Sequence, residues 1–444
     1  MVVGGGLAGC AAALELAARS AEVALVRAGP GATALSWGTL DVAAGSPLRR
    51  GGLPLVDPAS EQPLAPGRRL VAATHANPAH PYTVLMRGRS PESEVKEAAA
   101  ALDAWLAPAG LRVLGSVEQT RWLADLRGAL RAADLAFTGA GEGDLASAEE
   151  IALVDVPGLA GFDARPALRM LAAELAAIGL PARPLRVVPL ALPDALAALA
   201  GEPARLARRL DESEARQALR AAIERLAAPG RLLLFPPVLG LERVDRVIAW
   251  ASDTAGCRVA ELVGAPPLAL AGHRLDRALQ AALARAGVEA FAGRVSAIEL
   301  EAGRAVAVRI QDPAREAGEP ERLALDALVL ATGRFVGGGV VERDGRLAEP
   351  LLELPLYDLA GQRVDGIRPH RLVRRDYEGE QPLFAAGVRT DARLRPLAAD
   401  GAPRAANAFA AGDLLGSFDP ARDRTGLGVA LLSGRRAGIE AAGC

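Results

Sequence analysis

The first nine residues constrain the fold of this chain more than any other stretch. Gly4, Gly6 and Gly9 have the spacing G-x-G-x-x-G, between the apolar residues 1–3 and the Ala/Leu-rich residues 7–19. At a strand-to-helix junction, the first glycine permits a tight turn, the second lets the backbone approach a phosphate, and the third lets the helix pack on the strand. Unpaired N–H groups at the start of the helix favour the same anion. These residues therefore predict a nucleotide-binding strand–turn–helix unit.

The second strand of this unit, expected over residues 21–27, ends in Arg27. Dinucleotide sites usually have Asp or Glu here, about 20 residues after the glycines, to accept hydrogen bonds from the adenosine ribose. A guanidinium group cannot accept hydrogen bonds, so Arg27 argues against an ordinary NAD site. Four interpretations of this position stay open. The site could bind FAD with an unusual adenosine pocket, a mononucleotide, or a phosphate near Arg27, or Arg27 could be a solvated arginine at a strand end.

The first strand is short, because only three residues precede Gly4. Strands usually run for about five or six residues. A start further upstream would explain the short strand, and the true start of the protein stays open.

Two later stretches also combine an apolar strand with a turn of small residues. ALVLATG (327–333) and NAFAAGDLLG (407–416) are apolar strands that end in small residues, which lets backbone approach a cofactor at the carboxyl edge of a sheet. Asp413 has the place of the aspartate that accepts hydrogen bonds from a flavin's ribityl chain in two-dinucleotide-fold flavoproteins; a helix N-cap is the alternative. The order of the three elements favours a flavin fold. The expected cofactor contacts here are Thr332, Gly333, Gly412 and Asp413.

We predict an α/β fold, namely a Rossmann-like flavoprotein of the glutathione-reductase type with two dinucleotide-binding domains and an inserted α/β second domain. Residues 1–70 would begin the flavin-binding domain, 71–272 would form the inserted or partner domain, and 273–444 would complete the flavin-binding domain with a β-meander, the GD strand and a closing helix. Within the insert, residues 91–230 are expected to be mainly helical, because their pattern is dominated by Ala and Leu.

Composition excludes several other classes of protein. The net charge of −2 provides no basic field for nucleic acid or anionic lipid. The three cysteines fit neither a zinc ribbon nor an iron–sulfur cluster, and we expect no metal site. No signal peptide is visible, and no clean apolar span of about 20 residues occurs. These features indicate a reducing cytosol. Any membrane association would be peripheral or through a partner.

Histidine is the commonest general base in enzymes, and the chain has four. His80 lies in the rigid segment HPY, and His370 directly follows Pro369 in the second half of the chain. These two are the candidates for a proton acceptor, while the catalytic residues are otherwise unassigned.

The stretches LVLATGRFVGGGVVERDGRLAEPLLELPLY, NAFAAGDLLGSFDP, SWGTLD and HPYTVL resemble the B subunit of anaerobic glycerol-3-phosphate dehydrogenase. The resemblance implies a flavoprotein using FMN, with FAD as the alternative, and places Ser36 and Gly38 of SWGTLD near the cofactor. It implies two partners: a catalytic, FAD-bearing A subunit and an iron–sulfur C subunit that anchors the complex at the inner face of the cell membrane. The complex would oxidise sn-glycerol 3-phosphate to dihydroxyacetone phosphate and pass electrons to quinone, with this chain transferring electrons through its flavin.

Two other functions stay open. The chain could be a structural or adaptor subunit with little bound flavin, which the short first strand and the missing ribose carboxylate favour. It could also be a stand-alone FAD-dependent oxidoreductase that acts on another small substrate.

Overall fold

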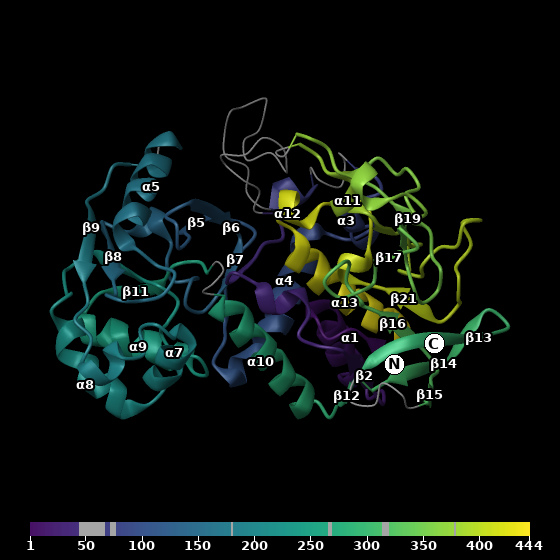
Figure 1. Cartoon of the computed structure of the whole chain (residues 1–444), viewed down its shortest axis with the longest axis horizontal. Helices are drawn as coiled ribbons and strands as arrows, with labels where there is room; N and C mark the ends of the chain where they lie inside the picture. Colours follow the sequence, from purple (N-terminus) through teal and green to yellow (C-terminus); the bar gives the residue numbers. More distant parts are fainter. Residues whose placement is uncertain (44–66, 72–76, 179–180, 265–268, 313–318, 377–378) are drawn as a thin grey trace. The chain divides into compact units, whose positions relative to one another are not determined.

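The computed structural model describes residues 1–43, 67–71, 77–178, 181–264, 269–312, 319–376 and 379–444 (Figure 1). These residues form two compact units. Unit 1 takes residues 1–33, 41–99 and 279–444, and unit 2 takes residues 34–40 and 100–278. The segment that links the first sheet to the expected insert, 44–66, lies outside the described residues. The domain boundaries after residues 70 and 272, and the two-domain scheme as a whole, stay predictions.

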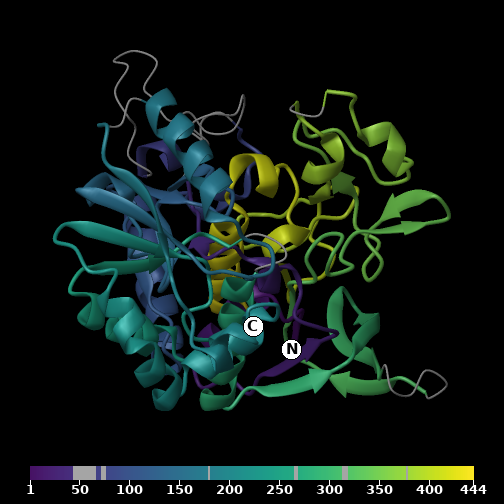
Figure 2. The same ribbon diagram turned by 60° about the vertical axis from the view of Figure 1, so that its left-hand side comes forward.

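The core of unit 1 is a five-stranded sheet in which each neighbouring pair is parallel. In spatial order its strands are β12 (Glu289–Ala292), β2 (Ala24–Arg27), β1 (Val2–Val3), β16 (Leu328–Leu330) and β21 (Ala408–Ala410). Figure 2 shows the green strand β12 beside the purple N-terminal strands. Although β1 has only two residues, it is the central strand and pairs on both sides. Parallel pairing brings the turns after β1, β16 and β21 to one edge of the sheet.

Two helices pack against each other beside this sheet, α1 (Leu7–Ala17) and α13 (Gly426–Ala441) (Figure 1). Gly434 and Gly438 of α13 face α1 so closely that an added Cβ would lie 2.3 Å from the carbonyl oxygen of Ala8 and 2.6 Å from that of Ala12. The absence of side chains at these positions lets the two backbones approach. As a result, the middle of the last helix lies against the first turns of α1.

The remainder of unit 1 surrounds this sheet with short antiparallel elements and small helices. Residues 294–311 form an antiparallel hairpin, and β15 adds a third strand to it, so a β-meander occurs within residues 273–444. These elements are β13 (Arg294–Glu301), β14 (Arg304–Gln311), β15 (Glu321–Ala324), β17 (Val341–Arg343), β18 (Arg346–Ala348), β19 (Leu356–Tyr357), β20 (Gly387–Val388), α3 (Pro81–Leu85), η4 (Pro369–Leu372), α11 (Pro382–Ala385), η5 (Gly412–Leu414) and α12 (Pro420–Asp423).

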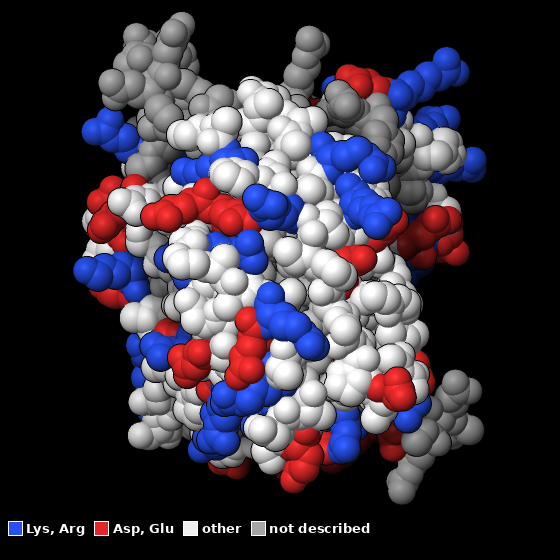
Figure 3. Space-filling view, turned by 90° about the vertical axis from the view of Figure 1, so that its left-hand side faces the viewer, with Lys and Arg blue, Asp and Glu red and all other residues white. Residues whose placement is uncertain are grey.

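Unit 2 has its own parallel sheet of four strands in the order β11-β10-β8-β9. Its elements are β8 (Glu150–Asp155), β9 (Leu185–Pro189), β10 (Arg231–Phe235), β11 (Arg258–Glu261), α5 (Ala164–Ala177), α6 (Asp194–Ala197), α7 (Pro203–Leu210), α8 (Ser213–Glu224), α9 (Val244–Ala255) and η3 (Leu145–Ser147). Two helices contain residues of both units: α4 (Pro91–Leu106), which η2 (Ala107–Ala109) follows, and α10 (Leu270–Arg285). Figure 3 shows basic and acidic side chains interspersed over one face, in keeping with the near-zero net charge.

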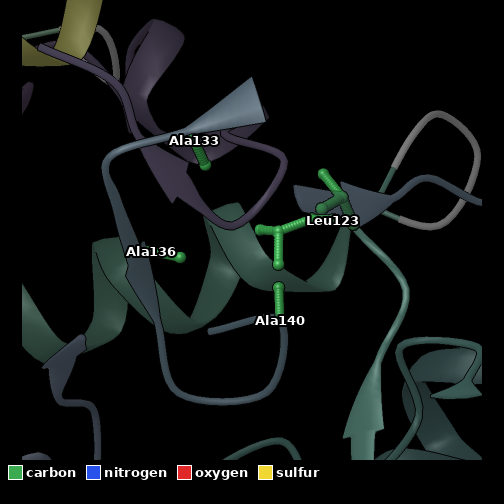
Figure 4. Close-up of a cluster of buried hydrophobic side chains, with 5 residues drawn as sticks. Leu123, Ala133, Ala136 and Ala140 are labelled. Carbon is green, nitrogen blue, oxygen red and sulfur yellow. The ribbon is translucent and has the colours of Figure 1, made fainter. Parts of the chain in front are cut away.

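The expectation of mainly helical structure over residues 91–230 is wrong between residues 113 and 137. This stretch contains β4 (Val113–Gly115), β5 (Arg121–Ala124), β6 (Leu130–Ala133) and β7 (Leu135–Phe137), and β7 also pairs with β3 (Thr39–Leu40). Leu123, Ala133, Ala136 and Ala140 pack together there (Figure 4). Short strands rich in Ala and Leu have little β-propensity of their own, so tertiary pairing decides their conformation.

Candidate functional site

Gly4 and Gly9 are required by the packing of the first turn itself. Gly4 has φ +118°, and an added Cβ would lie 2.1 Å from the carbonyl oxygen of Ala331 on the neighbouring strand. A Cβ at position 9 would lie 1.8 Å from the carbonyl oxygen of Gly4. Any side chain at either position would therefore push the turn, the helix or β16 out of place.

Gly6 is different, because the protein's own packing does not require it to be glycine. Its φ of −76° suits any residue, and an added Cβ would approach only Thr33 Oγ1, at 3.2 Å. Thr33 Oγ1 accepts a hydrogen bond from the Leu7 N–H at 2.8 Å, and no side chain caps α1 at Gly6. A Cβ here would fill a space at the helix N-terminus, which is where a phosphate would bind.

Arg27 lies at the end of β2 and packs along the same turn. An added Cβ on Gly5 would lie 2.7 Å from Arg27 Cβ, and Arg27 Nε donates a hydrogen bond to the Gly29 carbonyl oxygen at 3.3 Å. The arginine therefore occupies the place of the usual ribose-binding carboxylate and covers the glycine turn with its side chain.

The ATG turn after β16 is held by the glycine-rich segment that follows it. Added Cβ atoms on Gly337 and Gly339 would lie 2.0 Å from the carbonyl oxygens of Thr332 and Gly333, respectively. Thr332 Oγ1 is shielded from solvent and has no hydrogen-bond partner among the described residues. The hydroxyl lies against Gly339, where an added Cβ would be 2.4 Å from it.

The GD turn after β21 lies against α1 and α13. Gly412 has φ +71°, an added Cβ would lie 2.8 Å from Ala8 Cβ, and the Gly412 N–H donates to Ser433 Oγ at 2.8 Å. Asp413 lies in η5 without capping it, so the N-cap alternative is wrong. Its Oδ1 is shielded from solvent and lacks a hydrogen-bond partner within the described part of the chain.

The surroundings of Asp413 are those of a buried carboxylate that a hydrogen-bond donor from a ligand would stabilise. Burial raises the pKa of Asp413, and the positive charge of Arg334 opposes this rise. Burying a carboxylate without hydrogen bonds is costly. A ligand with hydroxyl or N–H groups would therefore stabilise the ionised form.

A third unpartnered oxygen lies at the start of α13. Thr425 is fully buried, and its Oγ1 has no partner among the residues that the structure describes. The next residue, Gly426, is so close to the GD turn that an added Cβ would lie 3.8 Å from Asp413 Oδ1. Because these oxygens can donate or accept hydrogen bonds, they match the hydroxyl, carbonyl and N–H groups of a flavin.

The sequence analysis missed Arg334, which directly follows the ATG turn. The side chain is only 6% exposed; Nε donates to the Asp413 carbonyl oxygen at 3.1 Å and Nη2 donates to that of Leu415 at 2.8 Å. An arginine after a small-residue strand end was the available signal, but the abundance of Arg in this chain weakened it.

Two of the predicted cofactor contacts fall outside unit 1. Ser36 and Gly38 belong to unit 2, where Gly38 has φ +107° and packs against Ala140 and Ala271. Their place near the flavin stays a prediction.

The two histidine candidates differ in their surroundings. His80 is buried, its Nδ1 accepts a hydrogen bond from the Tyr82 N–H at 3.1 Å as the N-cap of α3, and its ring contacts Phe418. Burial lowers the pKa of His80 to about 4. His370 is exposed on η4. These contacts give His80 a structural role, and a catalytic role for either residue stays a prediction.

Over the described ranges, no group of three or more His, Cys, Asp or Glu side chains is arranged to hold a metal ion. None of the helices in this part of the chain is both long and apolar enough to span a membrane.

Comparison with known proteins identifies the family of the chain. Residues 1–429 match the family model described as an FAD binding domain. The B subunit of anaerobic glycerol-3-phosphate dehydrogenase from Yersinia pseudotuberculosis serotype I (strain IP32953) is 31% identical, over 98% of this chain and 95% of that protein. The probable B subunit of the same dehydrogenase from Halobacterium salinarum (strain ATCC 29341 / DSM 671 / R1) is 30% identical, over 100% of this chain and 97% of that protein.

Among solved structures, 3-ketosteroid delta1-dehydrogenase from Sterolibacterium denitrificans aligns with 100% of this chain and 98% of its own at 11% identity, with a TM-score of 0.43. Because that score is low, the fold assignment rests on the parallel sheet of unit 1 and on the family match. The chain belongs to the FAD binding domain family and to the family of anaerobic glycerol-3-phosphate dehydrogenase B subunits, and it is a flavoprotein of the oxidoreductase class.

Proposed function

We propose that this chain is the flavin-bearing, electron-transferring subunit of a quinone-reducing anaerobic glycerol-3-phosphate dehydrogenase, which oxidises sn-glycerol 3-phosphate to dihydroxyacetone phosphate. The observation that carries this proposal is the set of solvent-shielded, unpartnered oxygens on Thr332, Asp413 and Thr425 at the carboxyl edge of the sheet. The choice of substrate rests on relatives of about 30% identity that are named as B subunits of this dehydrogenase.

The flavin site would be built by the three turns together. The N–H groups at Gly6 and the start of α1 would bind the phosphate of the cofactor, while Gly4 and Gly9 shape the turn. Asp413 would accept hydrogen bonds from the ribityl hydroxyls, and Thr332 and Gly333 would contact the cofactor from the ATG turn. When bound, the flavin accepts an electron pair from a donor and releases the electrons singly.

For the identity of the flavin we propose FAD, since the matching family is described as an FAD binding domain. FMN, which the sequence resemblance implies, is the alternative. Arg27 packs along the glycine turn in place of a ribose carboxylate, so the adenosine half of FAD would be held without the usual acceptor.

For the partners we propose a catalytic, FAD-bearing A subunit and an iron–sulfur C subunit that anchors the assembly at the inner face of the cell membrane. The relatives' designation as B subunits supports an assembly of several different chains.

The decisive experiment is purification of the full chain, alone and together with its A and C partners. We expect a yellow protein whose flavin is released by heat and identified by chromatography, and glycerol-3-phosphate:quinone activity only in the complex. A colourless chain that takes up neither FAD nor FMN would overturn the flavin proposal in favour of the adaptor role. Oxidation of a small substrate by the isolated chain would overturn the subunit role.

A further inference from the structure

Arg334 joins two turns of the candidate flavin site that lie far apart in the sequence. It follows the ATG turn of β16, and its guanidinium group donates to main-chain carbonyl oxygens of the GD segment: Asp413 at 3.1 Å, Leu415 at 2.8 Å and Phe418 at 3.5 Å. The group also lies 5.2 Å from the centre of the Phe418 ring. One side chain thus holds the whole segment 413–418.

This segment needs such support, because it is neither helix nor strand over most of its length. Gly412 has φ +71° and Ser417, a residue with a side chain, has φ +63°. Left-handed conformations of non-glycine residues persist only where the surrounding structure enforces them. An arginine can satisfy several carbonyl oxygens at once because its five N–H donors have a fixed planar arrangement.

The guanidinium group also brings a positive charge near the Asp413 carboxylate, whose Oδ1 has no partner among the described residues. Arg334 is buried, and its hydrogen bonds go to carbonyl oxygens, so its charge is compensated through space by Asp413 and Asp419. Asp419 is itself engaged as the N-cap of α12, where it accepts N–H groups of Ala421 and Arg422. Asp413 is therefore the nearby acid whose Oδ1 has no partner within the described residues.

We propose that Arg334 is a positioning residue for flavin binding: it holds the GD turn in its binding conformation and supplies the buried positive charge that faces the Asp413 carboxylate. This inference rests on the proposed flavin-binding function. The inference goes beyond that function because it assigns an effect on flavin affinity to Arg334, a residue that is not itself expected to touch the flavin.

The charged groups near Arg334 determine how its removal would change the pKa of Asp413. Arg334 reaches it from the turn after β16, while Asp419, Arg422 and Asp423 belong to α12 and the segment before it. With Arg334 gone, burial acts on Asp413 without opposition, and its pKa rises further. A protonated Asp413 has lost most of its capacity to accept hydrogen bonds from the flavin's hydroxyl groups.

The test uses the full chain with Arg334→Met and Arg334→Lys, and Arg389→Met as the matched control. Arg389 also donates to a carbonyl oxygen, that of Gly361, and its guanidinium group stacks on the ring of Tyr357. Neither of these two contacts is with the ATG turn or the GD turn. Affinity for FAD and FMN would be titrated from pH 5.5 to 9 after removal of bound flavin, with circular dichroism to monitor folding.

For Arg334→Met we expect roughly tenfold weaker flavin binding at neutral pH, with the pH midpoint of binding moved upward. Arg334→Lys, which keeps the charge but not the planar donors, should keep the wild-type midpoint while binding more weakly. Adding Asp413→Asn to Arg334→Met should abolish the pH dependence.

Three results would count against the proposal. Wild-type affinity with an unmoved midpoint in a folded Arg334→Met variant would overturn it while leaving the flavin function standing. If Arg334→Met does not fold, a Lys variant with the wild-type affinity as well as the wild-type midpoint overturns the positioning role. A wild-type chain that binds neither flavin overturns the proposed function and this inference together.

Discussion

The carbonyl oxygen of Gly4 lies 1.8 Å from the point that a Cβ atom of residue 9 would occupy. This contact ties the start of α1 to the turn that precedes it, and it leaves no room for a side chain. At Gly6, in the same turn, an added Cβ would meet only the side chain of Thr33, at 3.2 Å, so a small shift of that side chain would admit it. The glycines of one motif therefore serve two purposes, packing and ligand approach, and substitution can separate them.

Alanine at position 9 should destabilise the fold, whereas alanine at position 6 should spare the fold and impair flavin binding. For Gly9→Ala we expect a loss of about 3 kcal/mol or more in the free energy of unfolding, since an overpacked backbone must shift. For Gly6→Ala the change should stay within about 1 kcal/mol. Urea unfolding and the flavin-to-protein ratio measure the two effects. Equal flavin content in Gly6→Ala and wild type would show that the phosphate lies elsewhere, and the larger Gly6→Val repeats the test.

Asparagine at position 413 should weaken flavin binding and make the stability of the flavin-free protein less dependent on pH. Burial raises the pKa of Asp413 in the folded state. The unfolded chain therefore loses this proton at lower pH, and the stability of the folded state falls as pH rises from the unfolded pKa through the folded pKa. Asn avoids this cost but cannot replace the ionised acceptor, so affinity should fall roughly tenfold to a hundredfold. Melting temperatures of the flavin-free proteins at pH 4 and pH 7, with fluorescence titration of flavin, test both parts. An Asp413→Asn variant whose melting temperature depends on pH as strongly as that of the wild type would contradict the stability part.

Acid should destabilise the protein through His80. Its pKa is lowered to about 4 in the folded state by burial, from an ordinary value near 6.5. The unfolded chain therefore binds the proton first, and the contribution of the neutral ring to stability, complete above about pH 6.5, is lost as pH falls towards about 4. His80→Asn keeps an N-cap for α3 and should flatten the melting temperature in this range. A parallel pH profile of the two proteins would show that another group titrates. A loss of glycerol-3-phosphate oxidation in the complex, with the melting profile flattened, would instead support His80 as the proton acceptor.

The ion pair of Glu261 and Arg274 should be the most sensitive charged contact of unit 2. The two side chains are 2% and 3% exposed, with Nη1–Oε2 at 2.5 Å and Nη2–Oε1 at 3.0 Å. Arg274→Met leaves the carboxylate buried without its cation and should cost about 3–5 kcal/mol. Arg277→Met is the control, because its pair with Glu242 is exposed and should contribute less than about 1 kcal/mol. Equal losses in the two variants, measured by chemical denaturation, would contradict the assignment.

Much of the site's framework could be predicted because it depends on local chemistry. Glycine spacing, apolar strands and the terminal residues of those strands are properties of short segments, and the structure has β1, β2, β16 and β21 where these segments predict strands. The hairpin of β13 and β14 was predictable for the same reason, since its alternation has a period of two residues. The strands between residues 113 and 137 were not, because their Ala-rich segments become strands only when partners are present.

By itself, the sequence identified the segments that form strands of the unit 1 sheet and the turns that follow them, since apolar runs closed by small residues are a local property. Only the tertiary structure decided what each residue does there. It distinguished the packing glycines 4 and 9 from Gly6, because that difference depends on the distance to Ala331, Gly4 and Thr33. It also joined Arg334 to carbonyl oxygens about eighty residues away. Such a contact leaves no periodic trace in a sequence, because burial and long-range geometry create it.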